Sequence, residues 1–295
     1  MKTLRKTLRL IATTALFLVI YVPSTFAQGG SVAISVVQSL TAGVSTDGGT
    51  NPSGTFSGAQ TAGDSNYIMV EYWPPSAPLT GPVTSVTDAQ GNIYTRQCGP
   101  LTTISSGSYT NECGGGNPTA DGNDTIVEMW LANSIKAADA GANTVTMQMT
   151  NPGHMVGWNM WLLEIHIATA GSILALDKFV STQTNSSSPT GISTGTTATT
   201  TSPNEIFIAW CLPVSGLCQP SPSSPWVDMP LSGGEDFDTH SGAAYLIATS
   251  EQTASALFGA GSTNGDEAIA GILTFKSVPP ANLPKPPTSL TATVQ

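Results

Sequence analysis

Beyond its N-terminal segment, this chain consists of short apolar runs separated by clusters of glycine, proline, asparagine and serine. Some runs alternate apolar and polar positions and others are apolar throughout, which is typical of strands buried on one face or on both. The nearest helix candidate, the Ala-rich stretch 132–142, is short and reaches Gly141. The pattern predicts strands at 32–38, 67–73, 83–88, 93–97, 125–131, 144–149, 158–167, 173–179, 206–212, 243–248 and 268–275.

Strands at this spacing predict an all-β fold, an antiparallel β-sandwich. The turn 88–92 should form a hairpin between two strands, because Gly91 and Asn92 tolerate the positive φ that such a turn needs. The Ser/Thr-rich segment 181–202 has Ile192 as its one large apolar residue and predicts a long surface connection or an edge segment. We see no repeat of fixed period, so residues 28–277 are interpreted as one domain.

The N-terminus has the three parts of a secretory signal peptide. An apolar region at 10–22 is too short for a stable membrane span, and Thr25-Phe26-Ala27 forms a cleavage motif. We therefore expect residues 1–27 to be a signal helix that is removed, and the mature protein to be secreted, either extracellular or at the cell surface. The basic residues that precede the apolar region are Lys2, Arg5, Lys6 and Arg9.

Removal of the signal makes the protein strongly acidic. Four of the nine Lys and Arg residues are lost and all nineteen Asp and Glu residues remain, so the net charge becomes 5 − 19 = −14. This charge argues against a nucleic-acid partner and against an anionic membrane surface, both of which need clustered basic residues. We expect no membrane insertion after cleavage.

Several short stretches resemble β-sandwich modules of secreted bacterial proteins, jelly-roll or concanavalin-like in general shape. The stretches are VTSVTDAQGNIYTRQ (83–97), DTIVEMW (124–130), ANTVTMQM (142–149) and the Trp-rich strand 158–167. The resemblance implies a surface or adhesive role and carries over no catalytic residue.

Such modules often precede fibronectin type III repeats. The Pro-rich linker from 278 and the alternating run PTSLTATV (287–294) resemble the start of a fibronectin type III or Ig-like domain. Further C-terminal domains of the same polypeptide are therefore expected partners.

The four cysteines are an even number, as expected for disulfides in an exported chain. The simplest of the three connectivities pairs Cys98 with Cys113 and Cys211 with Cys218, each across a short loop. A metal site built from all four thiolates is disfavoured, because neither pair has the C-x2-4-C spacing.

Three predicted strands carry a glutamate and a tryptophan on the same face, since side chains an even number of positions apart share a face. If these strands are neighbours, the mixed faces merge into a ligand-binding surface. Indole rings suit stacking on sugar rings and carboxylates accept hydroxyl hydrogen bonds, so an extracellular glycan is the first ligand. The predicted ligand-binding residues are Trp73, Trp130, Trp158 and Glu71.

Two other interpretations stay open. Paired carboxylates at suitable distance hydrolyse glycosides, and Glu128 with Glu164 would be that pair in an enzyme. Alternatively, loops cover the second face and the glutamates lie at its rim, which leaves a purely structural surface or spacer domain. The resemblance argues against the enzyme, because concanavalin-like glycosidases carry E-x-D-x-E on one strand and each strand here has a single Glu.

Two acidic loops are candidate calcium sites, but our first prediction is that the protein needs no cofactor or metal. Calcium takes six to eight oxygen ligands, so neither loop suffices alone. The candidate ligands are Asp121, Asp124, Asp236 and Asp238. The pattern as a whole favours a secreted, non-catalytic module for adhesion or recognition.

Overall fold

The computed structural model describes residues 33–44, 51–73, 83–102, 126–149, 157–186, 191–213, 218, 222–229, 241–259 and 266–279. The predicted signal peptide, the C-terminal linker and the strand-like tail lie outside these residues. Among the described residues there is no helix, and hence none long and apolar enough to cross a membrane. The predicted all-β class with antiparallel strands is confirmed.

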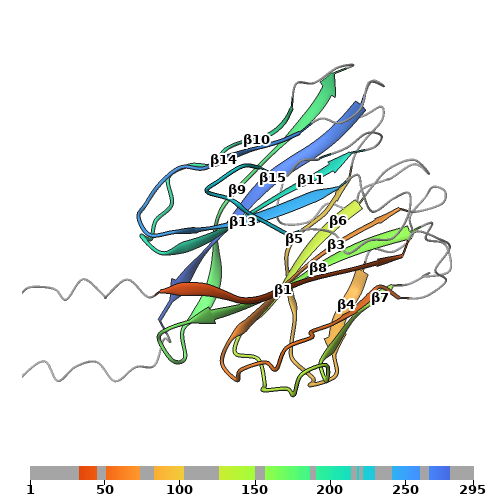
Figure 1. Cartoon of the computed structure of the whole chain (residues 1–295), viewed down its shortest axis with the longest axis vertical. Coiled ribbons are helices and arrows are strands. Elements are labelled where there is room, and N and C mark those ends of the chain that lie inside the picture. Colours follow the sequence, from red (N-terminus) through yellow and green to blue (C-terminus); the bar gives the residue numbers. More distant parts are fainter. Residues whose placement is uncertain are drawn as a thin grey trace, which may run out of the picture. The chain divides into compact units, whose positions relative to one another are not determined.

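The strands of the described residues form four sheets; Figure 1 shows how they are arranged. The first five-stranded sheet has the order β1-β8-β3-β6-β5, and the second has the order β12-β13-β11-β15-β9. A three-stranded sheet has the order β2-β7-β4, and β10 pairs with β14. In the first sheet, β1 is Ile34–Val44, β3 Ser65–Trp73, β5 Thr95–Thr102, β6 Ile126–Ala132 and β8 Gly157–Ile167. In the second, β9 is Ile173–Ser186, β11 Glu205–Pro213, β12 Val227–Asp228, β13 Gly242–Ala248 and β15 Asp266–Val278. In the small sheets, β2 is Ser53–Thr55, β4 Val83–Asp88, β7 Thr144–Met149, β10 Ile192–Thr196 and β14 Ser255–Phe258.

The strand order of the first half of the chain recurs in the second half. In the first half the first strand pairs with the last, which pairs with the third, in the order β1-β8-β3-β6-β5. The second half has the matching order β9-β15-β11-β13-β12, and the small sheets match through β2-β7 and β10-β14. The chain therefore contains two topologically similar halves, although its sequence shows no repeat of fixed period.

Every predicted strand is present, but four short ones were missed: β2, β10, β12 and β14. The segment 181–202 was predicted to be a surface connection or an edge segment. The second alternative holds at its start, where β9, an edge strand of the second sheet, continues to Ser186, and β10 begins at Ile192. Threonine favours extended backbone on a half-buried sheet, so a Ser/Thr-rich stretch can form strands when a neighbour supplies hydrogen bonds.

The expected hairpin at residues 88–92 is also wrong. β4 pairs with β7 and β5 pairs with β6, so the turn is a corner between two sheets. Gly91 has the expected positive φ of 68°. Asp88 holds the corner: its Oδ1 accepts hydrogen bonds from the Gln90 and Asn92 amides at 3.1 and 2.9 Å, and its Oδ2 accepts one from Tyr94 Oη at 2.9 Å.

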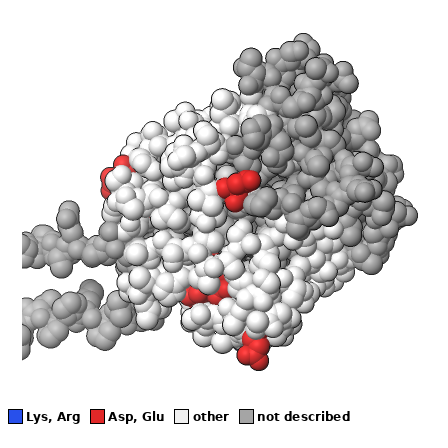
Figure 2. Space-filling model, viewed as in Figure 1, with Lys and Arg blue, Asp and Glu red and all other residues white. Residues whose placement is uncertain are grey.

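The face of the molecule in Figure 2 carries few charges. Its acidic residues are scattered, and no Lys or Arg of the described residues is visible there. This distribution fits a protein with few charged residues, which are 9% of the chain.

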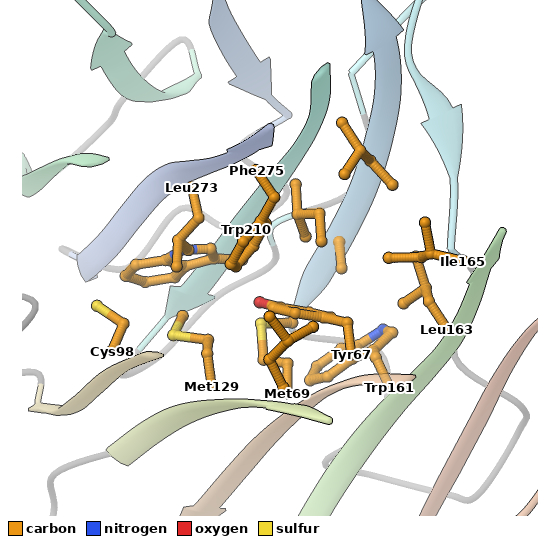
Figure 3. Packing of buried hydrophobic residues seen from close by; sticks show 14 of the residues in the cluster. Tyr67, Met69, Cys98, Met129, Trp161, Leu163, Ile165, Trp210, Leu273 and Phe275 are labelled. Atoms are coloured by element: carbon orange, nitrogen blue, oxygen red, sulfur yellow. The ribbon is translucent and has the colours of Figure 1, made fainter. Parts of the chain in front are cut away.

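The central core lies between the two five-stranded sheets (Figure 3). The first sheet contributes Tyr67, Met69 and Trp161, and the second contributes Trp210 and Phe275, all fully buried. The Tyr67 and Phe275 rings meet edge to face with centroids 5.6 Å apart, a favourable geometry for aromatic pairs.

Each five-stranded sheet also buries its other face. Ile68, Val70 and Leu162 of the first sheet join Val145 and Met147 of the three-stranded sheet in a second core. A third core joins residues of the second sheet, such as Phe207 and Ile272, with Ile192 and Phe258 of the β10–β14 pair. Strands covered on both faces need apolar residues on both, which explains the unbroken burial of β6 and β11.

The disulfide predicted between Cys211 and Cys218 is confirmed, with Cα atoms 5.8 Å apart. Cys98 is also disulfide-bonded, and Cys113 lies outside the described residues.

Candidate functional site

The three glutamates singled out in the sequence are all fully buried in the first five-stranded sheet. Glu71 is on β3, Glu128 on β6 and Glu164 on β8, and each side chain has no exposed surface. They do not line an open ligand face.

The expected merging of three mixed faces is wrong for β3. Strand registers place Val70 opposite Glu128, and Asn66 opposite Glu164, while Glu71 is opposite Asn159. Residues directly opposite share a face, so Glu71 points to the side opposite Glu128 and Glu164. Glu71 therefore faces the second five-stranded sheet, whereas the other two face the three-stranded sheet.

Glu128 connects the first sheet to β4. Its Oε1 accepts hydrogen bonds from Tyr72 Oη and from the Val83 amide, each at 3.0 Å. Its Oε2 lies 2.9 Å from Arg96 Nε. Burial raises the pKa of Glu128, and the nearby Arg96 charge offsets only part of that rise. All these partners are structural, so the carboxylate acts as a link between strands.

Glu164 lies in a second polar cluster on the same face. Its Oε2 accepts a hydrogen bond from Gln38 Nε2 at 2.5 Å, and its Oε1 accepts one from the Thr61 amide at 2.9 Å. Burial raises its pKa, and the adjacent Asp64 carboxylate contributes to the rise. Asp64 in turn contacts Nδ1 of the half-exposed His166 at 2.7 Å.

Glu128 and Glu164 do not form a catalytic pair. β3 lies between their strands, and the residues opposite them on β3, Val70 and Asn66, are four positions apart. At about 3.3 Å per residue and 4.8 Å per strand, their Cα atoms are roughly 16 Å apart. Glycoside hydrolysis needs carboxyl groups about 5–10 Å apart.

The predicted indole surface is closed where the structure describes it. Trp158 is 5% exposed and Trp130 is 6% exposed. The guanidinium of Arg96 lies over the Trp130 ring, 4.8 Å from its centroid. Neither indole presents a free face to a sugar. Trp73 is the last residue of β3, and its side chain lies outside the description.

Glu71 instead marks the end of the molecule where the two large sheets meet. Its Oε1 accepts a hydrogen bond from Ser241 Oγ at 2.5 Å, and its Oε2 accepts one from Asn159 Nδ2 at 3.3 Å. Ser241 directly precedes β13, in the second half of the chain. No local sequence signal identifies this contact, because its two partners are 170 positions apart.

A further polar cluster, which sequence reasoning missed, lies on the outer face of the second five-stranded sheet. Asp177 on β9 accepts hydrogen bonds from Lys276 Nζ at 2.9 Å and from Thr201 Oγ1 at 2.6 Å. The Thr201 amide donates to the other carboxylate oxygen at 2.9 Å. Burial alone would raise the pKa of Asp177, but the bonds from Thr201 and Lys276 outweigh it and hold the pKa well below its usual range.

Glu205, on β11, completes this cluster. Its side chain is fully buried, and its Oε1 accepts a hydrogen bond from the Ser202 amide at 3.0 Å. Burial is the main cause that raises the pKa of Glu205 to about 7, and the neighbouring Asp177 carboxylate adds to the rise. The group is therefore substantially protonated at neutral pH. No local sequence pattern places Glu205 in this cluster; the pairing of β11 with β15, from distant parts of the chain, does so.

The candidate calcium ligands Asp121, Asp124, Asp236 and Asp238 lie outside the described residues. Within the described part of the chain, no group of three or more His, Cys, Asp and Glu residues is arranged to hold a metal ion.

Comparison of the chain with known protein families, with curated proteins and with solved structures finds no match.

Proposed function

We propose that the chain is a secreted, non-catalytic β-sandwich module for adhesion or recognition, and that its ligand binds at the end of the molecule marked by Glu71. The jelly-roll comparison and the following fibronectin type III-like domain remain predictions within this proposal. The observation that carries it is the meeting of strand ends from both large sheets at this one end.

The registers place these strand ends at one level within each sheet. In the first sheet, Tyr72 is opposite both Ile126 and Trp158. In the second, Pro213 is opposite Ala268 and Cys211 is opposite Gly242. The hydrogen bond between Glu71 and Ser241 joins the two sets.

Long polar connections leave from these strand ends. Residues 103–125 join β5 to β6 of the first sheet, residues 74–82 join β3 to β4, residues 150–156 join β7 to β8, and residues 230–240 precede Ser241. Binding residues are commonly carried by loops on a rigid scaffold, and sheets buried on both faces make a rigid one. Trp73, at the end of β3, is the predicted ligand-binding residue whose position fits this proposal.

The test is binding of the mature protein to a glycan array and to extracellular matrix proteins. We expect replacement of residues 103–125 by a short Gly/Ser linker, and Trp73→Ala, to abolish binding. The matched control is Ile93→Ala, since Ile93 is 83% exposed and lies beside the β4–β5 corner, at the other end of β5. Unchanged binding by the loop and Trp73 variants would refute the proposed location. A folded protein that binds nothing would favour the structural spacer.

A further inference from the structure

Three reactive side chains lie side by side on adjacent strands of the second five-stranded sheet. The strands are neighbours in the order β11-β15-β9 and carry Glu205, Lys276 and Asp177 respectively. Lys276 is directly opposite Glu205 in the register, and opposite Ala175 on its other side. Asp177 is the extra residue of a bulge in β9, because the partners of Lys178 and Leu176 on β15 are consecutive. Bulges redirect side chains, and this one brings the carboxylate to the lysine.

The amine and the carboxylate are in direct contact. Lys276 Nζ lies 2.9 Å from Asp177 Oδ1, and the Asp177 side chain is 4% exposed. Thr201 Oγ1 accepts a hydrogen bond from the same Nζ at 2.8 Å and donates to the same Oδ1 at 2.6 Å. The Lys276 nitrogen and the Asp177 carboxyl are therefore held together, with the carboxylate nearly buried and the lysine side chain 32% exposed.

Glu205 supplies a proton-exchanging group beside this contact. Residues directly opposite in an antiparallel pair have Cβ atoms about 5 Å apart, so the Glu205 side chain lies next to that of Lys276. Its Oε2 is buried, and the Thr274 hydroxyl and the Asp177 carboxyl are hydrogen-bonding neighbours of the Glu205 carboxyl group. When protonated, Glu205 donates a hydrogen bond to Asp177 and is placed to exchange a proton with it.

We propose that Lys276 and Asp177 condense to form an intramolecular isopeptide bond, with Glu205 as the catalytic proton carrier. The ammonium first transfers its proton to the carboxylate, which leaves a neutral amine beside a neutral acid. As the nitrogen lone pair attacks Cγ of Asp177, protonated Glu205 gives its proton to the Asp177 carbonyl oxygen and then takes a proton from the attacking nitrogen. Glu205 gives that proton to one of the two hydroxyls now on Cγ, which leaves as water, and takes one from the remaining hydroxyl. A C–N bond forms, a C–O bond breaks, one water leaves and Glu205 is protonated again. The step requires no oxidant, reductant or cofactor.

Proximity lowers the barrier. Well-oriented intramolecular reactions reach effective molarities of about 10⁵–10⁸ M, so contact between the two groups can replace much of the activation that amide formation otherwise needs. The resting ion pair keeps the reactants aligned, and burial of Asp177 limits hydrolysis of the amide.

The first half of the chain provides an internal contrast. There too the first and last strands are bridged by side chains, Gln38 on β1 and Glu164 on β8. An amide nitrogen is not a nucleophile, so that bridge cannot condense. The ion pair between Arg96 and Glu128 also joins two strands, but a delocalised guanidinium is a poor nucleophile. The site formed by Asp177, Lys276 and Glu205 has both an amine and an acid.

The bond would connect the first and last strands of the second half, close to the point where β15 leaves the sheet. The two residues are 99 positions apart, so the link closes a long loop. A pulling force applied at the C-terminal end of β15 would then pass through a covalent bond into β9, and would no longer separate the two strands by breaking hydrogen bonds alone.

The test is the intact mass of the full chain, secreted from its host, purified, reduced and denatured. We expect a mass one water below that of the processed sequence, and tryptic mapping that finds one branched peptide joining Asp177 to Lys276. Lys276→Arg and Glu205→Gln should each restore the full mass. Glu205→Gln keeps an acceptor for the Ser202 amide, so it should remain folded. Lys178→Arg is the control and should keep the water loss, because Lys178 Nζ lies farther away, 3.4 Å from the other oxygen.

A folded wild-type chain with its full mass would overturn the proposal and leave an ordinary ion pair. Loss of water mapped to any other residue, such as a succinimide elsewhere, would overturn it as well. Neither result depends on whether the protein binds a ligand, so this test is independent of the proposed function.

Discussion

Removal of the Glu128 carboxylate should destabilise the fold strongly, because it links two sheets. Glu128→Ala leaves Tyr72 Oη and the Val83 amide without the acceptor that both now share. An unsatisfied buried polar group costs about 1–3 kcal/mol, so the two donors cost roughly 2–6 kcal/mol together. Arg96 adds little, since its side chain is 30% exposed and can reach water. We therefore expect a loss of about 3–5 kcal/mol from these two donors.

The measurement is equilibrium unfolding in guanidinium chloride, followed by tryptophan fluorescence and by circular dichroism. Glu128→Gln is the matched variant: it keeps an oxygen acceptor for both donors, and should lose only about 1 kcal/mol. A loss below about 1 kcal/mol for Glu128→Ala, with native circular dichroism, would refute the structural role of this carboxylate. Equal losses for the alanine and glutamine variants would show that the charge, and not the acceptor, is what matters.

Three further predictions address other parts of the fold. Burial raises the pKa of Glu164 above its ordinary value of 4.5, so the stability of the wild-type protein should fall as pH rises from about 4.5 through the folded-state pKa. In denaturant titrations at several pH values, Glu164→Gln should lack that part of the decline. Plots of stability against pH that run parallel for the wild type and the variant would contradict the assignment. Replacement of Cys211 and Cys218 by alanine opens a short loop and should lower the free energy of unfolding by about 2 kcal/mol, seen as a lower melting temperature in calorimetry, whereas an unchanged temperature would show that the bond adds nothing. Gly271→Ala would put a methyl group 2.6 Å from Trp210 Cζ2 and 2.7 Å from the Val180 carbonyl oxygen, so it should cost about 1–3 kcal/mol of unfolding free energy, and a neutral result would mean that the Trp210 ring can move aside.

Strand positions could be predicted well because burial leaves a direct pattern in the chain. The strands expected at 83–88 and 144–149 coincide with β4 and β7. The short strands β2 and β12 have too few residues to show any period. The partner of a strand is not visible in such a pattern, which is why the corner at Asp88 was predicted as a hairpin.

The candidate site was predicted less well, for a reason that concerns register. Alternation correctly separates the two faces of β3, β6 and β8, but it cannot tell which face of one strand adjoins which face of the next. A shift of one residue exchanges the faces, and the observed register places Glu71 on the opposite side from Glu128. The second error was to expect exposure. Glu128, Trp130 and Trp158 are buried because the three-stranded sheet covers the outer face of the first sheet, whereas Glu71 is buried between the two large sheets.

The sequence by itself determined the all-β class, the positions of the longer strands and the local disulfide between Cys211 and Cys218, because these depend on neighbours within a few residues. Only the tertiary structure decided that the strand order recurs in two halves, that the glutamates are buried, and that Lys276 meets Asp177 beside Glu205. Those features depend on contacts between residues far apart in the chain, 99 positions in the last case. The physical reason is that β-strands satisfy their hydrogen bonds with partners from anywhere along the sequence, so the pairing, and the chemistry that it brings together, leaves no local trace.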